Sequence, residues 1–146
     1  MVTHLFDTHI CIFLLNQRGG HEHIVRRMDG MLRGQIGISA ISVAELAFGV
    51  AASRRQIDNL GRLERFFAEF ELLPFDHAAA HPYGSLRYHL QAQGTPIGAL
   101  DLLIAAHTLS LDATLVTHNT REFARVPGLK LEDWTTHTDP RKPPWP

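Results

Sequence analysis

The chain has 146 residues, a formal net charge of −1 and 45% hydrophobic residues, values typical of one globular domain. This composition gives no general sign of a basic nucleic-acid-binding surface, and no apolar run reaches the roughly 20 residues of a membrane helix. The start of the chain lacks the basic and apolar segments of a signal peptide, so we expect a cytoplasmic protein. Cys11 is the only cysteine, and its apolar surroundings favour a buried, unreactive thiol.

Short apolar runs alternate with amphipathic segments along the chain. The pattern predicts strands at 2–6, 35–39, 72–75, 113–117 and 129–132, and helices at 10–15, 21–33, 42–52, 54–71, 76–93, 99–111 and 120–124. Pro74 places the strand at 72–75 on an edge of the sheet, and the strand at 129–132 is a second edge candidate. This alternation predicts an α/β fold, a parallel sheet with helices on both faces. The segment 135–146 is polar and Pro-rich, and we expect a tail that is disordered or lies along a surface.

Four polar side chains occur where a predicted strand ends or a helix starts. Asp7 follows the first strand, and Glu45 lies in the first turns of the helix after the second. Asp101 opens the apolar helix at 99–111, and Asn119 follows the strand at 113–117. If the strands are parallel, Asp7, Glu45 and Asn119 lie at one edge of the sheet, where ligands bind in such folds. Asp101 can join them if its helix packs with its N-terminus at the same edge.

Helix capping is the alternative explanation for each of these residues. Asp7 and Asn119 are good N-cap residues, and Ser42 with Glu45 forms a capping-box pattern. Asp101 in a first turn is also favoured by the helix dipole. Capping alone explains the set of four less well, because Asp101 adds a charge to an otherwise apolar segment.

Clustered carboxylates favour a divalent cation among them. Like charges raise one another's pKa values unless a cation compensates, and oxygen ligands suit Mg²⁺, with Mn²⁺ as a second candidate. Such an ion activates water and neutralises a phosphate oxygen, so the pattern suits metal-assisted hydrolysis of phosphodiester bonds. Thr8 and Thr117 are candidates to hold a carboxylate or a water. His9 and Arg121 are further candidates for contact with substrate, Arg121 as part of a basic rim around the site.

Two other kinds of chemistry remain as alternatives. His77 and His81 have the spacing of zinc ligands on a helix, but no HExxH pattern or supporting cysteine accompanies them. A phosphatase or receiver domain on a similar sheet would require a second acid at position 9 or a lysine near the acids. The chain has His9 there, and its only lysines are Lys130 and Lys142. Patterns for phosphate-binding loops, dinucleotide binding and serine hydrolases do not occur.

In its ordered motifs the chain resembles the PIN-domain ribonucleases and, within them, the VapC toxins of bacterial toxin–antitoxin pairs. The resemblance extends from Leu5 to Trp134, and its pieces are FDTHICI (6–12), ISAISVAELAFG (38–49), PIGALDLLIAAH (96–107) and LVTHNTREFARVPGLKLEDW (115–134). The last two pieces are most similar to the branch of initiator-tRNA-specific endonucleases. The resemblance implies a PIN domain at 1–134, followed by the tail at 135–146.

The resemblance also implies an activity and partners. It implies a Mg²⁺-dependent endoribonuclease that leaves a 5′-phosphate and a 3′-hydroxyl, with Asp7, Glu45 and Asp101 at the metal-site positions and Asn119 at a fourth catalytic position. It further implies a homodimer and a VapB-type antitoxin, whose C-terminal segment blocks the active-site groove and which alone contacts operator DNA. The alternative from another class is a catalytically silent PIN-like module that binds a protein partner.

Two positions depart from the family pattern. His9 stands where the family usually has Asn, which changes the local hydrogen bonding. Asn119 is neutral where many members carry a fourth acid, so we expect one well-held metal ion and a second only when RNA phosphates help to bind it.

Overall fold

The computed structural model describes residues 1–136, so positions 137–146 of the predicted tail lie outside the described residues. The strands are β1 (His4–Phe6), β2 (Ile36–Ser39), β3 (Glu71–Leu73), β4 (Thr114–Val116) and β5 (Lys130–Glu132). The helices are α1 (Thr8–Asn16), α2 (His21–Asp29), α3 (Ala40–Ala51), α4 (Gln56–Phe67), α5 (His77–Ala92), α6 (Ala99–Ser110) and α7 (Thr120–Phe123). None of these helices is long and apolar enough to cross a membrane.

The strands form one sheet in the order β3-β2-β1-β4-β5, and every pairing is parallel. The two strands predicted as edges, β3 and β5, are the edges. From β1 the chain adds β2 and β3 on one side, then crosses back to add β4 and β5 on the other. The order therefore reverses between β1 and β4, and a crevice for ligands is expected at their carboxyl ends.

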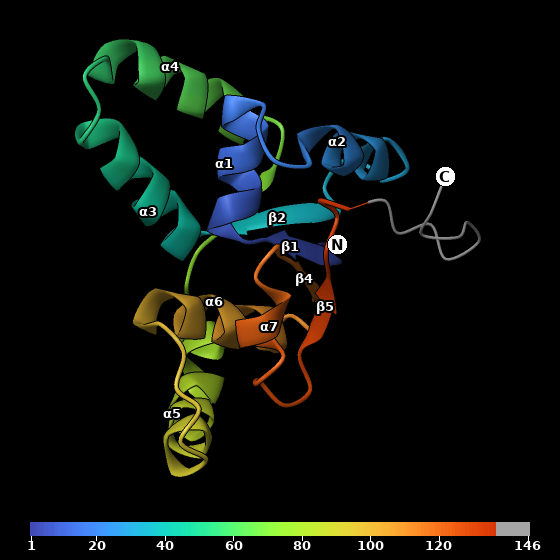
Figure 1. Cartoon of the computed structure of the whole chain (residues 1–146), viewed down its shortest axis with the longest axis vertical. Helices are drawn as coiled ribbons and strands as arrows, with labels where there is room; N and C mark the ends of the chain where they lie inside the picture. The colour runs from blue at the N-terminus through green and yellow to red at the C-terminus, as the bar shows by residue number, and fades with distance from the viewer. Residues whose placement is uncertain (137–146) are drawn as a thin grey trace.

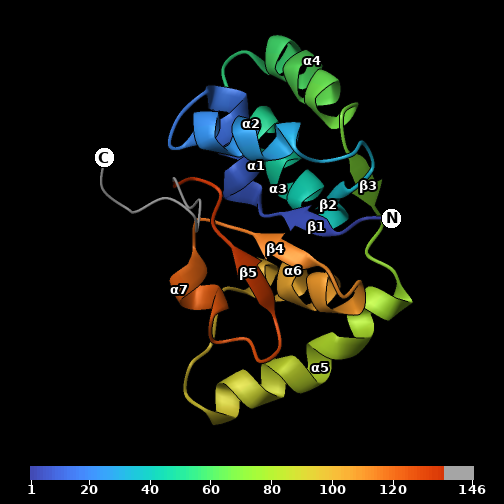
Figure 2. The same ribbon diagram turned by 90° about the vertical axis from the view of Figure 1, so that its right-hand side faces the viewer.

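Helices cover both faces of the sheet, as predicted (Figures 1 and 2). Helices α1 to α4 lie on one face and α5 to α7 on the other. Alternation along the central strands fills both cores, because successive side chains point to opposite faces. Phe6 and Val116 pack toward α1, whereas Leu5 and Leu115 pack against α5 and α6. The α/β prediction is thus confirmed.

Helix α3 begins earlier than the capping-box pattern predicts. Its N-cap is Ser39, whose hydroxyl accepts a hydrogen bond from the N–H of Ile41, and the helix starts at Ala40. Ser42 is a buried residue inside the helix, so the predicted capping box with Glu45 is wrong. Two serines three residues apart offered alternative caps, and the one that directly ends β2 is used. The carboxylate of Glu45 is therefore not a cap partner.

Candidate functional site

The side chain of Asp7 lies at the point where the strand order reverses, and only 1% of the residue is exposed. Its Oδ1 accepts a hydrogen bond of 2.8 Å from the N–H of Thr8, and its Oδ2 accepts one of 2.9 Å from the hydroxyl of Thr117. Burial raises the pKa of Asp7, the two hydrogen bonds and nearby His9 oppose this rise, and the charge of Glu45 adds to it. Asp7 does cap α1, but only one of its oxygens is used for that.

Thr117 connects the ends of β1 and β4. Its fully buried hydroxyl oxygen accepts a hydrogen bond of 2.9 Å from the backbone N–H of Asn119. A hydroxyl has one proton, so this acceptance leaves the proton free to go to Asp7. The contact of Thr117 with a carboxylate, expected from the sequence, is therefore present and fixes the orientation of Asp7.

The carboxylate of Glu45 on α3 is held by Thr8, the first residue of α1. The hydroxyl of Thr8 donates a hydrogen bond of 2.8 Å to Oε1 of Glu45 and lies 2.9 Å from Oγ of Ser42. Thr8 thus contributes its backbone N–H to Asp7 and its hydroxyl to Glu45. One residue thus positions both the carboxylate that precedes α1 and a carboxylate of α3.

Asp101 lies in the first turn of α6 and is partly buried. Burial and then the charges of Asp7, Glu45 and Glu122 raise its pKa from 3.8 to about 6, while His9 lowers it. Asp7, Glu45 and Glu122 are therefore close enough to Asp101 for their charges to influence its ionisation. The structure brings Asp101 to the same edge of the sheet as the residues after β1 and β2.

Asn119 does not cap α7 with its side chain. Its side-chain amide instead donates a hydrogen bond of 2.6 Å to Oε2 of Glu122. Glu122 was missed as a site residue in the sequence, and its three-residue spacing from Asn119 is that of a capping box. That same three-residue spacing was the available signal, because it places both side chains on one side of a short helix.

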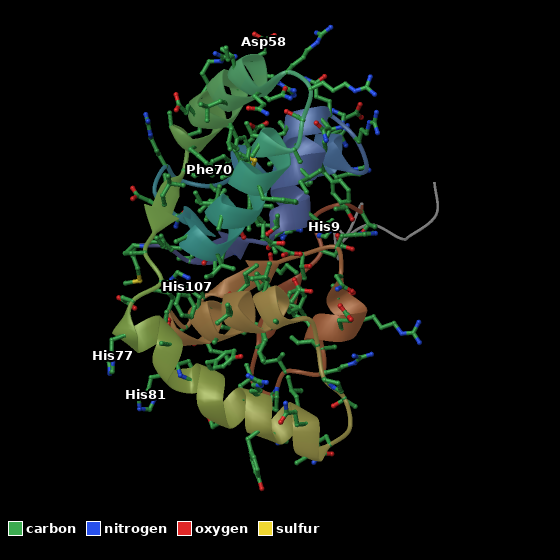
Figure 3. All side chains as sticks on the ribbon, turned by 90° about the vertical axis from the view of Figure 1, so that its left-hand side faces the viewer. His9, Asp58, Phe70, His77, His81 and His107 are labelled. Carbon is green, nitrogen blue, oxygen red and sulfur yellow. The ribbon has the colours of Figure 1, made fainter. Side chains whose placement is uncertain are left out.

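His9 and Arg121, the remaining candidates, are both exposed. His9 lies at the start of α1, on the side facing α6 (Figure 3), and its charge stabilises the ionised forms of Asp7 and Asp101. Arg121 lies on α7, between Asn119 and Glu122. Both could therefore contact a bound anion at the rim.

The alternative metal and nucleophile residues stand apart from this site. His77 and His81 lie side by side on exposed α5, with ring centroids 6.5 Å apart, well away from His9 (Figure 3). Cys11 is completely buried, and burial raises the pKa of its thiol far above the usual value, so the thiol is unreactive.

The carboxylates suit a hard cation that keeps part of its water shell better than a cation enclosed entirely by protein ligands. Within residues 1–136, no group of three or more His, Cys, Asp or Glu side chains is positioned to hold a metal ion. The donors are nevertheless carboxylate oxygens whose mutual repulsion a cation would relieve. Mg²⁺ keeps several waters and takes only one or two carboxylates directly, so the donor set fits this ion.

A groove extends from this site between α1, α3 and α4. Its volume is about 270 Å³, and its lining includes Ile12 and Leu15 of α1, Glu45 and Val50 of α3, and Arg62 and Leu63 of α4. The walls are mainly apolar, with one carboxylate and one guanidinium. A mainly apolar groove therefore adjoins the acidic site at Glu45.

Comparison with known proteins identifies the relatives of this fold and site. The PIN domain family matches residues 5–129. The chain is 38% identical to the tRNA(fMet)-specific endonuclease VapC of Shigella flexneri, over 92% of this chain and 100% of that protein. It is 36% identical to ribonuclease VapC2 of Rickettsia felis, over 90% of this chain and 97% of that protein. A solved DNA-bound VapBC complex from Salmonella typhimurium matches with a TM-score of 0.85 at 38% identity, covering 92% of this chain and 99% of that one. VapBC-1 from nontypeable Haemophilus influenzae matches with a TM-score of 0.84 at 34% identity, covering 92% and 100%.

Proposed function

This chain belongs to the PIN-domain family, and we propose that it is the toxin of a VapBC-type toxin–antitoxin pair and acts as a metal-dependent endoribonuclease. The observation that carries the proposal is the convergence of Asp7, Glu45 and Glu122 on Asp101, whose pKa is raised to about 6 by burial and then by these three charges. A site that must hold a divalent cation is expected to carry this uncompensated charge. The family resemblance expected from the sequence is confirmed.

The chain's own residues perform the positioning. The carboxylates that would hold the ion, directly or through its waters, are those of Asp7, Asp101 and Glu45. Glu122, oriented by its hydrogen bond with Asn119, would add a further negative charge beside them. Bound Mg²⁺ would supply an activated water and neutralise a phosphate oxygen. Thr117 and the N–H of Thr8 keep the carboxylate of Asp7 in one orientation before substrate arrives. The carboxylate therefore need not reorient during the reaction. The expected products carry a 5′-phosphate and a 3′-hydroxyl.

The proposed substrate is RNA, and the first RNA to test is initiator tRNA, cut in its anticodon loop. Support comes from the relatives in Shigella flexneri and Salmonella typhimurium, both named tRNA(fMet)-specific endonucleases. Exposed His9 and Arg121 lie where a phosphate backbone would pass the acids. With RNA as the substrate, we expect the protein to act in the cytoplasm.

The proposed partners are a VapB-type antitoxin and a second copy of this chain. Structural neighbours are VapBC complexes, and the groove between α1, α3 and α4 offers a mainly apolar cleft for an antitoxin segment that would cover Glu45. Contact with operator DNA would come through the antitoxin alone. Phe48 of α3 and Leu100 of α6, on two helices that contact one another, are 74% and 46% exposed and are candidates for the dimer interface.

The test is cleavage of total RNA by the purified, antitoxin-free protein, with the RNA ends mapped by sequencing. Asp101→Ala is compared with Asp58→Ala, because each aspartate is the third residue of a 12-residue helix whose N-cap forms no side-chain hydrogen bond. Asp58 is exposed and lies at the end of the molecule formed by α4, away from His9 near the middle (Figure 3). We expect cuts that require Mg²⁺, disappear with EDTA and Asp101→Ala, and persist with Asp58→Ala.

Other outcomes would assign the chain differently. No metal-dependent cutting by folded protein would favour a silent PIN-like module that binds a protein partner. Cuts spread over many RNAs would keep the nuclease and reject the initiator tRNA. Cleavage of RNA by the Asp101→Ala variant would refute the proposed role of these carboxylates.

A further inference from the structure

A buried polar contact joins the two helices that carry Glu45 and Asp101. His107 of α6 is 2% exposed, and its Nδ1 lies 2.8 Å from Oγ of Ser39, at the end of β2. The same oxygen accepts a hydrogen bond of 3.1 Å from the N–H of Ile41. One buried hydroxyl therefore ends β2, starts α3 and contacts α6.

The donors and acceptors assign the proton positions in this contact. The Ser39 hydroxyl already accepts from the N–H of Ile41, and we assign its one proton to Nδ1 of His107, which is then an unprotonated acceptor. His107 is then neutral with its proton on Nε2. Burial lowers the pKa of His107, although the charge of Asp76 opposes this, and so favours the same neutral form. The Phe75 ring meets the imidazole edge-on at 5.4 Å and restricts its plane.

The contact joins the N-cap of α3 to the last turn of α6 and is equally far in sequence from each acid. Glu45 follows Ser39 by six residues along α3, and Asp101 precedes His107 by six residues along α6. At 1.5 Å per residue, the contact lies about 9 Å along each helix from its acid. A tilt of either helix at this point moves one carboxylate relative to the other.

We propose that His107 is a positioning residue for the acidic site, because its hydrogen bond with Ser39 holds α6 against the start of α3 and so sets the separation of Asp101 and Glu45. The inference rests on the proposed function, since it concerns how well these carboxylates receive a divalent ion and RNA. Displacements of about 1 Å in catalytic groups can lower rates on the order of 100-fold. His107 touches neither acid and acts only through the helices.

Three substitutions separate this role from simple packing. His107→Leu keeps an apolar volume but removes the acceptor for Ser39. His107→Asn keeps an oxygen near the position of Nδ1, so it should restore the contact. Thr108→Val is the matched control, because Thr108 is the next residue of α6, is fully buried, and donates its own 2.8 Å hydrogen bond within the helix to the carbonyl of Ile104.

The experiment measures Mn²⁺ binding by calorimetry and kcat and KM for RNA, at a temperature at which every variant is folded. We expect His107→Leu to weaken Mn²⁺ binding about 10-fold and to lower kcat on the order of 10- to 100-fold, with KM nearly unchanged. His107→Asn should recover most of both values. Thr108→Val should lower the melting temperature and leave both values as in the wild type.

The outcomes distinguish this inference from the proposed function. His107→Leu protein with wild-type Mn²⁺ affinity and kcat would overturn the inference and leave the nuclease in place. Should that variant fail to fold, Ser39→Ala removes the proton donor while His107 stays, and wild-type values there would overturn the inference equally. Wild-type protein that neither binds Mn²⁺ nor cuts RNA would refute the proposed function, and the role of His107 would fall with it.

Discussion

Replacing Asp101 with Asn should make the metal-free protein more stable while destroying its activity. Burial and three neighbouring carboxylates raise the pKa of Asp101 from 3.8 to about 6. At 1.36 kcal/mol per pKa unit, this rise corresponds to roughly 3 kcal/mol of unfavourable free energy in the ionised native state. Part of the side chain is exposed, so solvent screening reduces the expected gain to about 1–2 kcal/mol.

The pH dependence of this gain has a definite sign. Between about pH 3.8 and pH 6 the native state keeps a proton on Asp101 that the unfolded state has lost, so stability falls as pH rises through this window. Above pH 6 the full penalty is present, and below pH 3.8 it vanishes. The stabilisation by Asp101→Asn should therefore be largest near neutral pH and shrink as the solution is acidified.

Urea denaturation without metal, at about pH 5 and about pH 7.5, measures this difference. Asp58→Asn is the control, because it removes an acid from the same helical position in α4 and so loses the same dipole interaction, about 0.3–1 kcal/mol. Adding Mg²⁺ should stabilise the wild type by mass action and leave Asp101→Asn unchanged. The reasoning would be refuted if Asp101→Asn lowered stability as Asp58→Asn does, or if its gain were equal at both pH values.

Three further predictions concern residues around the acids. Thr117→Val removes a hydrogen bond to Asp7 and leaves the buried carboxylate less satisfied, so the free energy of unfolding should fall by about 1–3 kcal/mol in urea titrations; an unchanged value would contradict the contact. Glu122→Gln should lower the pKa of Asp101, followed by carboxyl NMR, whereas Glu64→Gln on α4 should not; equal effects would remove Glu122 from the site. Cys11 should react with a thiol reagent only as fast as the protein unfolds, and rapid labelling of native protein would contradict its burial.

The sequence was sufficient to predict the sheet and where Asp7, Glu45 and Asn119 lie relative to it, because both depend on local signals. Short apolar runs bounded by polar residues predicted each strand, and Pro74 correctly marked the strand before it as an edge. Parallel strands bring their carboxyl ends to one edge, so Asp7 and the residues after β4 were expected together. Asp101 was expected to join them only if its helix packed with its N-terminus at the same edge, a condition that concerns tertiary packing.

The cap of α3 and the partner of Glu45 depend on contacts between distant segments, which the sequence alone does not show. Ser39 and Ser42 are both plausible caps, and only the end of β2 and the contact with His107 select Ser39. Glu45 is consequently held by Thr8, 37 residues away in the chain. The role of Glu122 could not be predicted, because its local pattern with Asn119 equally describes a cap.

The most direct test of a single divalent-metal site is calorimetric titration of the antitoxin-free protein with Mn²⁺. The account predicts saturable binding by the wild type and by Asp58→Asn, and its loss in Asp101→Asn and in Asp7→Asn. Equal binding by all four proteins, or none by the folded wild type, would contradict the claim that these carboxylates form one metal site.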